Sequence, residues 1–334
     1  MSAAPRESRT VREIPALLRK KRWKVLVDQA AVPPAASPAP ATPDPHASIP
    51  TTGPYAGHLH FDASIAPVLR TEVDVAAYVR RGTSRLPVDT AALSTEEPLS
   101  PDLRLALGML QRLEDSALAE SRAMLATATG NEARITAFLA TWLVDRFWQS
   151  RALRDLLTGD HSTERPRPQH RPGVRHTLRR VHADRVQPLI SPLWTGLAGE
   201  AVAAGHMSRM AIQEASLQSA LRALSRRTGG ETHRVLEVVI ERHQASVDFF
   251  SAEAIARLTR SRREALTARV LLALGSPLEG GGIPDPDLRP ALAVLGAAAE
   301  DRAALRRARY EITRLLPGPA LPDPHLGSLP QIGA

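Results

Sequence analysis

The chain has 334 residues, of which 43% are hydrophobic, and its 43 basic and 35 acidic side chains give a net charge of +8. This length allows two or three domains, or one large helical domain with extensions. The chain contains no cysteine, which excludes disulfides, thiolate zinc sites, cysteine-ligated iron–sulfur clusters and a cysteine nucleophile. No stretch approaches the roughly 20 apolar residues of a membrane-spanning helix. We identify no signal peptide and therefore expect a cytoplasmic protein.

The first 60 residues divide into an arm and a linker. Residues 1–30 form a basic arm, and its segment 11–27 mixes apolar side chains with arginines and lysines. Such a segment is typical of a helix that binds a membrane surface or a partner, although packing on the body of the protein is the simpler expectation. Residues 31–60 are rich in proline and alanine, which predicts an extended linker. Three regions are expected to follow: an irregular or short-helix lead-in at 61–99, a helical domain at 100–317, and a C-terminal tail at 318–334.

From residue 100 onward, helix start and stop signals divide the chain, and no alternating β pattern of useful length is present. Ser100-Pro101 and Ser191-Pro192 each combine an N-cap residue with a proline at the first helical position. The stretch 159–188 is rich in arginine, histidine and proline and predicts a loop. These signals predict an all-α bundle with six helices, at about 101–130, 131–159, 192–228, 231–259, 261–275 and 287–317.

Polar side chains interrupt the apolar stripes of three predicted helices near their middles. Arg146 and Gln149 lie in the stripe of the second helix, Glu214 in that of the third, and His243 and Ser246 on the apolar face of the fourth. Neighbouring helices pack roughly 8–10 Å apart, so these groups can meet in the core. The apolar members of the stripes are Ile135, Leu139, Trp142, Leu153 and Leu156; Met207, Met210, Leu217, Leu221 and Leu224; and Val239 and Phe250.

Two interpretations of these polar groups stay open at this point. A lone buried arginine or glutamate costs several kcal/mol, so the first is a core ion pair between Arg146 and Glu214. Gln149, His243 and Ser246 would then complete its hydrogen bonds. The second interpretation is the remains of a ligand or metal site, and the spacing alone does not choose between the two.

Three segments resemble the core helices of the soluble acyl-carrier-protein desaturases. They are FLATWLVDRFWQSRALRDLL (138–157), HMSRMAIQEASLQSALRAL (206–224) and RVLEVVIERHQASVDFFSAEAIARL (234–258), and the resemblance covers roughly residues 100–316. The order of the helices agrees, as do the frame of Phe138, Trp142 and Ala152-Leu153 and the ending Asp248-Phe249-Phe250. The resemblance implies a ferritin-like four-helix bundle core with additional C-terminal helices and a Pro-rich N-terminal extension.

The resemblance also implies where the metal ligands of that family fall. Ferritin-like di-iron proteins use one glutamate from each of two helices and a Glu-x-x-His pair from each of two others. The first pair falls on Arg146 and Gln149, and the second on His243 and Ser246. No Glu-x-x-His or Asp-x-x-His occurs in any register of the chain. Both pairs are therefore lost, and Arg146 places a permanent cation where two dications would bind.

The two single glutamates of the family are easier to match. The third-helix glutamate is kept as Glu214. The first-helix ligand falls near Asp115 or Ser116, with Glu114 and Glu120 as neighbours. One carboxylate and one histidine are too few to hold two irons, so the implied site has no catalytic residue, no cofactor and no metal.

We therefore expect a ferritin-like pseudoenzyme, that is, a non-catalytic scaffold or binding protein. The resemblance suggests that it retains binding of an acyl chain or of acyl carrier protein, whose acidity suits a basic surface. It also suggests a homodimer, or a heterodimer with an active desaturase-like paralogue.

Two alternatives belong to other functional classes. One is an active di-iron acyl-carrier-protein desaturase or related oxidoreductase, with iron held by an atypical set drawn from Glu114, Glu120, Glu214, Glu241 and His243. The other is a basic interaction protein whose segments 11–27 and 159–188 dock on nucleic acid or an anionic membrane. No recognised nucleic-acid motif accompanies the charge, which disfavours nucleic acid as the partner.

Overall fold

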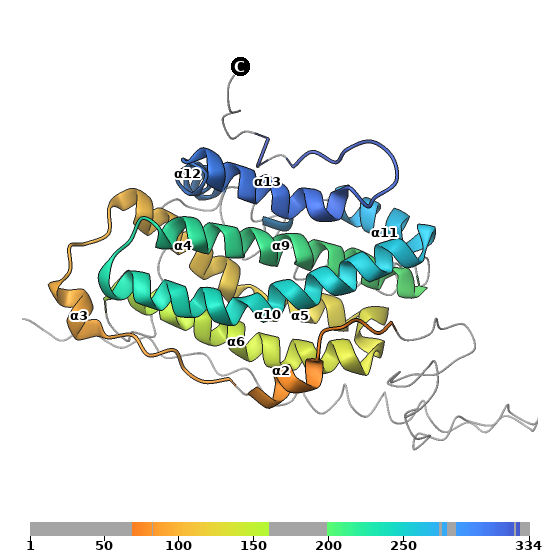
Figure 1. Ribbon diagram of the computed structural model, residues 1–334, viewed down its shortest axis with the longest axis horizontal. Helices are drawn as coiled ribbons and strands as arrows, with labels where there is room; N and C mark the ends of the chain where they lie inside the picture. Colours follow the sequence, from red (N-terminus) through yellow and green to blue (C-terminus); the bar gives the residue numbers. More distant parts are fainter. Residues whose placement is uncertain are drawn as a thin grey trace, which may run out of the picture. The chain divides into compact units, whose positions relative to one another are not determined.

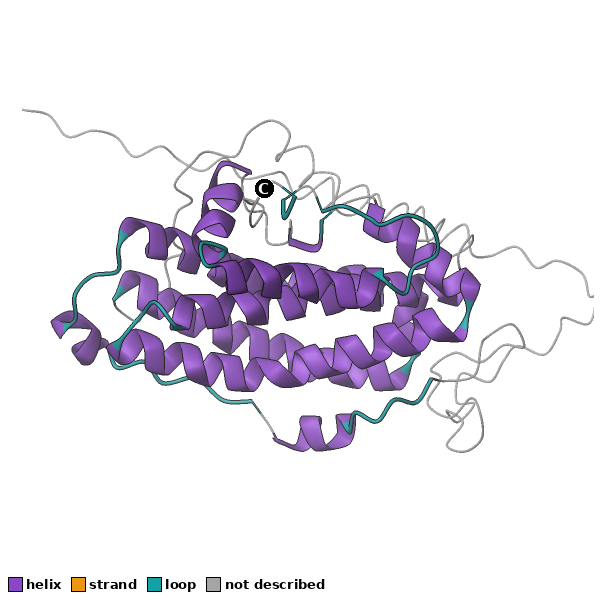
Figure 2. Ribbon diagram, turned by 45° about the horizontal axis from the view of Figure 1, so that its top comes forward, coloured by secondary structure: helices purple, strands orange, loops and turns teal. Residues whose placement is uncertain are grey.

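The computed structural model describes residues 69–81, 83–159, 199–273, 276–278, 285–323 and 325–327. Every regular element within these ranges is helical (Figures 1 and 2), so the all-α prediction is confirmed for this part of the chain. The basic arm, the Pro-rich linker, the Ser191-Pro192 signal and the expected loop beyond Gly159 lie outside the described residues. Within the same ranges, none of the helices combines the length and the apolar composition that crossing a bilayer needs.

Four long helices lie side by side and carry the polar groups singled out above (Figure 1). Helix α4 packs against α6 and α9, and α10 packs against α9 and α6. Three C-terminal helices add to this core, because α11 and α13 pack on α9 while α12 packs on α4. The bounds are α4 Pro101–Asp115, α6 Ala133–Thr158, α9 Val202–Ser225, α10 Gly230–Arg260, α11 Arg262–Ala273, α12 Asp285–Leu295 and α13 Ala299–Thr313.

The described part of the expected lead-in, from residue 69, contains two short helices. Helix α2 (Val75–Arg81) packs on α6, and α3 (Thr90–Thr95) packs on α10 and α6. Asp89 caps α3, since its side chain accepts hydrogen bonds from the backbone N–H groups of Ala91 and Ala92. This segment therefore belongs to the helical body.

Several helix ends follow the predicted signals. The Ser100 hydroxyl accepts a hydrogen bond from the backbone N–H of Leu103 at 3.3 Å and caps α4. Helix α6 ends at Thr158 and is followed by Gly159, whose φ of 70° is the left-handed conformation that favours glycine. Helix α10 begins one residue before the expected Glu231 and ends one residue after the expected Thr259.

Two predicted helices are divided into shorter elements. The expected helix 101–130 breaks after Asp115 and continues as α5 (Ala117–Leu125) and a 3₁₀ turn (Ala128–Asn131). The Ser116 hydroxyl donates to the carbonyl of Leu113 at 2.7 Å, and this local bond competes with the helical ladder. The expected helix 287–317 is α12 and α13, and the break follows Leu295 at Gly296, a residue that favours helix ends.

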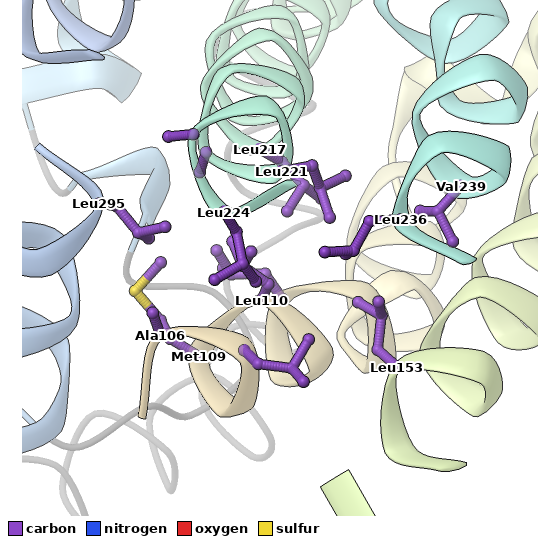
Figure 3. Packing of buried hydrophobic residues seen from close by; sticks show 14 of the residues in the cluster. Ala106, Met109, Leu110, Leu153, Leu217, Leu221, Leu224, Leu236, Val239 and Leu295 are labelled. Carbon is purple, nitrogen blue, oxygen red and sulfur yellow. The ribbon is translucent and has the colours of Figure 1, made fainter. Parts of the chain in front are cut away.

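The interior of the four long helices is layered. Leu110, Leu153, Leu221 and Leu236, one from each of α4, α6, α9 and α10, meet in an apolar cluster that we call the leucine layer (Figure 3). A second apolar cluster, the aromatic layer, contains Phe138, Trp142, Phe249 and Phe250. The rings of Phe138 and Phe249 stack with their centroids 3.6 Å apart, and Trp142 meets Phe250 edge-on at 5.5 Å.

Every member of the three predicted stripes is buried. Arg146 lies between Trp142 and Leu153 along α6, and His243 lies between Val239 and Phe250 along α10. The polar side chains are therefore enclosed by apolar packing on two sides.

Candidate functional site

Four charged or titratable side chains converge between the leucine and aromatic layers. Arg146 of α6, Glu114 of α4, Glu214 of α9 and His243 of α10 form this group, which we call the Arg146 cluster, and each is completely buried. Each long helix thus contributes one member. The two residues that the sequence analysis pairs are in contact, with Arg146 Nη1 2.6 Å from Glu214 Oε1.

Arg146 directs its guanidinium to three oxygen acceptors. Its Nε lies 2.5 Å from Glu114 Oε2, Nη1 donates to Glu214, and Nη2 donates to the backbone carbonyl of Leu113. The guanidinium carbon, Cζ, lies over the Trp142 ring, 5.4 Å from its centroid. The break after α4 places the last carbonyls of that helix here, and the negative end of a helix favours a cation.

His243 contacts both carboxylates from the opposite helix. Its Nε2 lies 2.9 Å from Glu214 Oε2 and 3.2 Å from the backbone oxygen of Glu214, while Nδ1 lies 3.6 Å from Glu114 Oε1. Burial, assisted by the charge of Arg146, lowers the pKa of His243 to about 3. His243 is therefore neutral at physiological pH, and the two oxygens around Nε2 favour the tautomer that carries its proton there.

The two carboxylates compete for one guanidinium. Burial raises the pKa of Glu114 to about 8, against the opposing effect of Arg146 and with the added effect of Glu214. Burial also raises the pKa of Glu214, again against Arg146. Burial disfavours the charged form of Arg146, but the two carboxylates outweigh it and raise the pKa of that side chain. With a pKa of about 8, the carboxyl of Glu114 is mostly protonated at neutral pH, which lowers the negative charge around Arg146.

The structure brings Glu114 of α4 into the Arg146 cluster. Asp115 is exposed, and the hydroxyl of Ser116 donates to the Leu113 carbonyl, so neither of these two expected residues joins the cluster. Neighbouring residues of a helix point about 100° apart, so a shift of one residue moves a side chain from the core toward solvent.

Two further polar residues were predicted to lie in the core beside this cluster. Gln149 and Ser246 are buried. Neither amide atom of Gln149 makes a hydrogen bond with any residue that the structure describes, contrary to the expectation that it completes the network. The strongest donors in the layer, those of Arg146, are already directed to Glu114, Glu214 and Leu113.

The atypical ligand set weighed above is only partly assembled. Glu114, Glu214 and His243 converge, whereas Glu120 pairs with Arg209 at 3.4 Å and Glu241 is exposed on α10. Among the described residues, no group of three or more His, Cys, Asp or Glu side chains is arranged to hold a metal ion. The guanidinium of Arg146 lies against the oxygens that a di-iron centre would use, so this donor set does not fit such a centre.

A second buried charge cluster escaped the sequence analysis. Arg257 of α10 contacts both carboxylate oxygens of Glu132, at 2.8 and 2.9 Å, and lies 3.2 Å from Glu253. Glu253 is shared with Arg134 at 3.2 Å. We call these four residues the Arg257 cluster. Its signal in the sequence is the continuation of the α10 stripe, which runs at spacings of three and four from Val239 through Phe250 to Glu253 and Arg257.

Comparisons with protein-family models, with curated proteins and with solved structures found no match for this chain. The resemblance to the acyl-carrier-protein desaturases therefore stays a prediction from the sequence.

Proposed function

We propose that this chain is a ferritin-like pseudoenzyme, in which a buried ion cluster replaces the di-iron centre and the helical scaffold serves a binding role. The four long helices are then the bundle implied by the resemblance. The proposal assigns no catalytic residue and no cofactor to the described part of the chain.

The observation that carries the proposal is the position of Arg146. The six positions matched to metal ligands, once the first is read as Glu114, come from four different helices and are all buried in one layer: Glu114, Arg146, Gln149, Glu214, His243 and Ser246. Within that layer the guanidinium lies 2.5 and 2.6 Å from the two remaining carboxylates. A fixed cation with this contact geometry offsets part of the charge of the two carboxylates at the place where a metal would bind, and it does so without redox chemistry.

The first test is a gain of metal binding. Purified protein expressed with added iron is analysed by mass spectrometry beside a variant that carries Arg146→Glu, Gln149→His, His243→Glu and Ser246→His. This variant restores both Glu-x-x-His pairs around Glu114 and Glu214. We expect no stoichiometric iron in the natural chain and close to two irons per chain in the variant.

A matched control separates this result from adventitious iron. The same variant with Glu114→Gln and Glu214→Gln lacks the two remaining carboxylates and should lose the metal. Two irons in the natural chain would overturn the pseudoenzyme and favour the active enzyme with an atypical ligand set. Three members of that set, Glu114, Glu214 and His243, do converge.

The bound partner is proposed from the resemblance alone. The resemblance suggests an acyl chain, an acidic acyl carrier protein or an active desaturase-like paralogue as partner. Of these, the acidic carrier protein agrees with the net charge of +8. Titration with acyl carrier protein, with and without an attached acyl chain, tests this role by calorimetry. Saturable binding that weakens with salt supports it, and no heat with either form removes it.

A further inference from the structure

The outward face of α6 is apolar, although the opposite face of the same helix already lines the core. At 100° per residue, five apolar side chains point away from the inward stripe that contains Trp142 and Arg146. We call these five residues the Phe147 patch: Ala137, Ala140, Val144, Phe147 and Trp148. Helices α2 and α6 lie on the side of the helical body opposite α12 and α13 (Figure 1). The C-terminal helices, which pack on α9 and α4, therefore leave the patch uncovered.

The patch exposes an aromatic pair. Phe147 is 53% exposed and Val144 is 40% exposed. The rings of Phe147 and Trp148 meet edge-on with their centroids 5.0 Å apart. Every other phenylalanine that the structure describes is completely buried. Since burial of a phenylalanine ring stabilises a protein, an exposed ring within an apolar patch marks a surface that another phase or molecule covers.

Arginines border the patch on the side of α2 and beyond its C-terminal end. Helix α2 lies along α6 here, since Tyr78 stacks on Phe138 with the centroids 4.7 Å apart and its hydroxyl lies 2.6 Å from Asp145. Farther along the chain, Arg85 lies 3.6 Å from Asp155 of α6. The bordering cations are Arg80, Arg81, Arg85, Arg151 and Arg154.

No exposed carboxylate accompanies these arginines in the two segments that form and border the patch. Residues 75–88 contain no acidic side chain, and residues 135–154 contain only Asp145, which is buried. Arg80 and Arg154 form no ion pair with any residue that the structure describes. The patch thus combines an uncharged centre with a border of one sign, which attracts anions and repels other cations.

A phospholipid surface with anionic headgroups matches both parts of this pattern. Phenylalanine and tryptophan favour the boundary between headgroups and acyl chains, and arginines beside it bind the phosphates. An acidic protein would match the arginines as well. It would also need a hollow shaped to receive Phe147, whereas lipids adapt to a projecting side chain. The exposed aromatic pair therefore favours the lipid surface.

We propose that the Phe147 patch docks on the surface of an anionic phospholipid bilayer, with α6 parallel to the membrane plane. Phe147 and Trp148 then enter the headgroup boundary, and the bordering arginines contact lipid phosphates. The docking surface shares no residue with the Arg146 cluster, so it does not depend on the proposed loss of the metal centre. It is also separate from the segments 11–27 and 159–188, for which the sequence alone suggests an anionic partner.

Binding to vesicles tests the apolar part of the patch. The full-length chain is centrifuged with vesicles of phosphatidylcholine and phosphatidylglycerol in equal parts, and with vesicles of phosphatidylcholine alone. We expect binding to the mixed vesicles that falls as salt rises, and weak binding to the neutral ones. Val144→Asp should lower the partition coefficient at least about tenfold. Val270→Asp, at a valine of α11 that is 47% exposed, should leave it unchanged.

Charge substitutions test the border with a matched control. Arg80→Gln combined with Arg154→Gln removes two cations beside the patch and should weaken binding to the mixed vesicles at least about tenfold. Arg289→Gln combined with Arg307→Gln removes two exposed arginines of α12 and α13 and changes the net charge equally. This control should have little effect. Circular dichroism checks that all variants keep their helix content.

Tryptophan fluorescence locates the contact. Lipids brominated in their acyl chains should quench the emission of the natural chain. Trp148→Phe should lose most of this quenching while it still binds the vesicles, because phenylalanine keeps the apolar contact. Trp142 is completely buried, so it does not reach the lipid.

Four results would overturn the proposal. The first is no binding of the natural chain to the mixed vesicles. Equal effects of Val144→Asp and Val270→Asp, or full quenching in Trp148→Phe, would assign the contact to another part of the chain. Saturable binding of acyl carrier protein that Val144→Asp removes, with vesicle binding unaltered, would assign the patch to an acidic protein instead.

Discussion

The Arg146 and Arg257 clusters both pair arginines with glutamates in the interior, but they differ in the number of guanidiniums for each carboxylate. In the Arg146 cluster one guanidinium serves Glu114 and Glu214, and all three are completely buried. In the Arg257 cluster two arginines serve two glutamates, and Arg134 keeps 20% of its side chain in contact with solvent. We call the Arg257 cluster balanced, because it has two guanidiniums for two carboxylates, and the Arg146 cluster unbalanced, because it has one for two. In the unbalanced cluster, burial and the charge of Glu214 raise the pKa of Glu114. A charge imbalance in the interior thus adds to the effect of burial and makes the site sensitive to pH.

The largest expected effect comes from removing the cation of the unbalanced cluster. Arg146→Met leaves two buried carboxylates without a positive partner and should lower the free energy of unfolding by about 3–5 kcal/mol. Denaturant unfolding at neutral pH measures this loss. The control is Arg146→Met combined with Glu114→Gln and Glu214→Gln, which removes all the charges together and should recover most of the stability. If the control loses as much unfolding free energy as Arg146→Met, the loss comes from changed packing and not from unpaired charges.

The same substitution in the balanced cluster should cost less. Arg257→Met deprives Glu132 of its guanidinium, but Glu253 keeps Arg134 and the hydroxyl of Thr71. We expect a loss of about 1.5–3 kcal/mol in the free energy of unfolding, the range for hydrogen bonds to charged groups. A loss as large as that of Arg146→Met would contradict the comparison between balanced and unbalanced clusters.

The unbalanced cluster should also give the stability a distinct pH dependence. The carboxyl of Glu114 has a pKa of 4.5 when unfolded and about 8 when folded. The folded protein therefore binds more protons between these values, and the free energy of unfolding falls as pH rises. The fall between pH 6.5 and 8 should be on the order of 2 kcal/mol. Unfolding curves measured across this window, in the natural chain and in Glu114→Gln, test it.

The pH window from 6.5 to 8 separates the effect of Glu114 on stability from that of His243. The folded pKa of His243 is about 3, below its ordinary 6.5, so its contribution is lost only as pH falls below 6.5. Glu114→Gln should flatten the slope above pH 6.5. An unchanged slope in that variant would assign the proton to another group.

The smallest effect is expected at Gln149, which lies in the same layer without a hydrogen bond from the described residues. Gln149→Met keeps the volume and removes an amide that is buried without compensation. The free energy of unfolding should stay the same or rise by about 1 kcal/mol. Thermal unfolding of the variant beside the natural chain measures it, and a clear loss of stability would show that the amide has a bonded partner.

Much of this architecture could be predicted from the sequence because it depends on local rules. Helix ends at Ser100 and Gly159 follow from capping chemistry, and the burial of Arg146, Glu214 and His243 follows from stripes of three and four residues. The break at Ser116 could not be predicted in this way. One side-chain hydrogen bond accompanies it, in a segment whose sequence pattern otherwise favours a continuous helix. Without knowledge of the break, the sequence pattern does not decide which of Glu114, Asp115 and Ser116 faces the core.

The pairing of charges across helices is harder to predict than their burial. The α10 pattern places Glu253 and Arg257 on the inward face, but the main partner of Arg257 is Glu132, which precedes α6 outside any α-helix. Which residues meet depends on how far each helix is displaced along its neighbour. That displacement is set by packing over the whole interior, which no single segment specifies.

The layered interior therefore fixes the axial alignment of the helices. A slide of α6 by one turn, about 5.4 Å, would move Arg146 out of reach of Glu114 and Glu214 and into the leucine or the aromatic layer. Leucine packing alone tolerates such a slide, because one leucine replaces another at the next turn. A charged layer between two apolar ones does not, as polar residues in coiled-coil seams illustrate. The buried contacts of Arg146 thus favour one axial alignment of the four helices over others that would bury a similar apolar area.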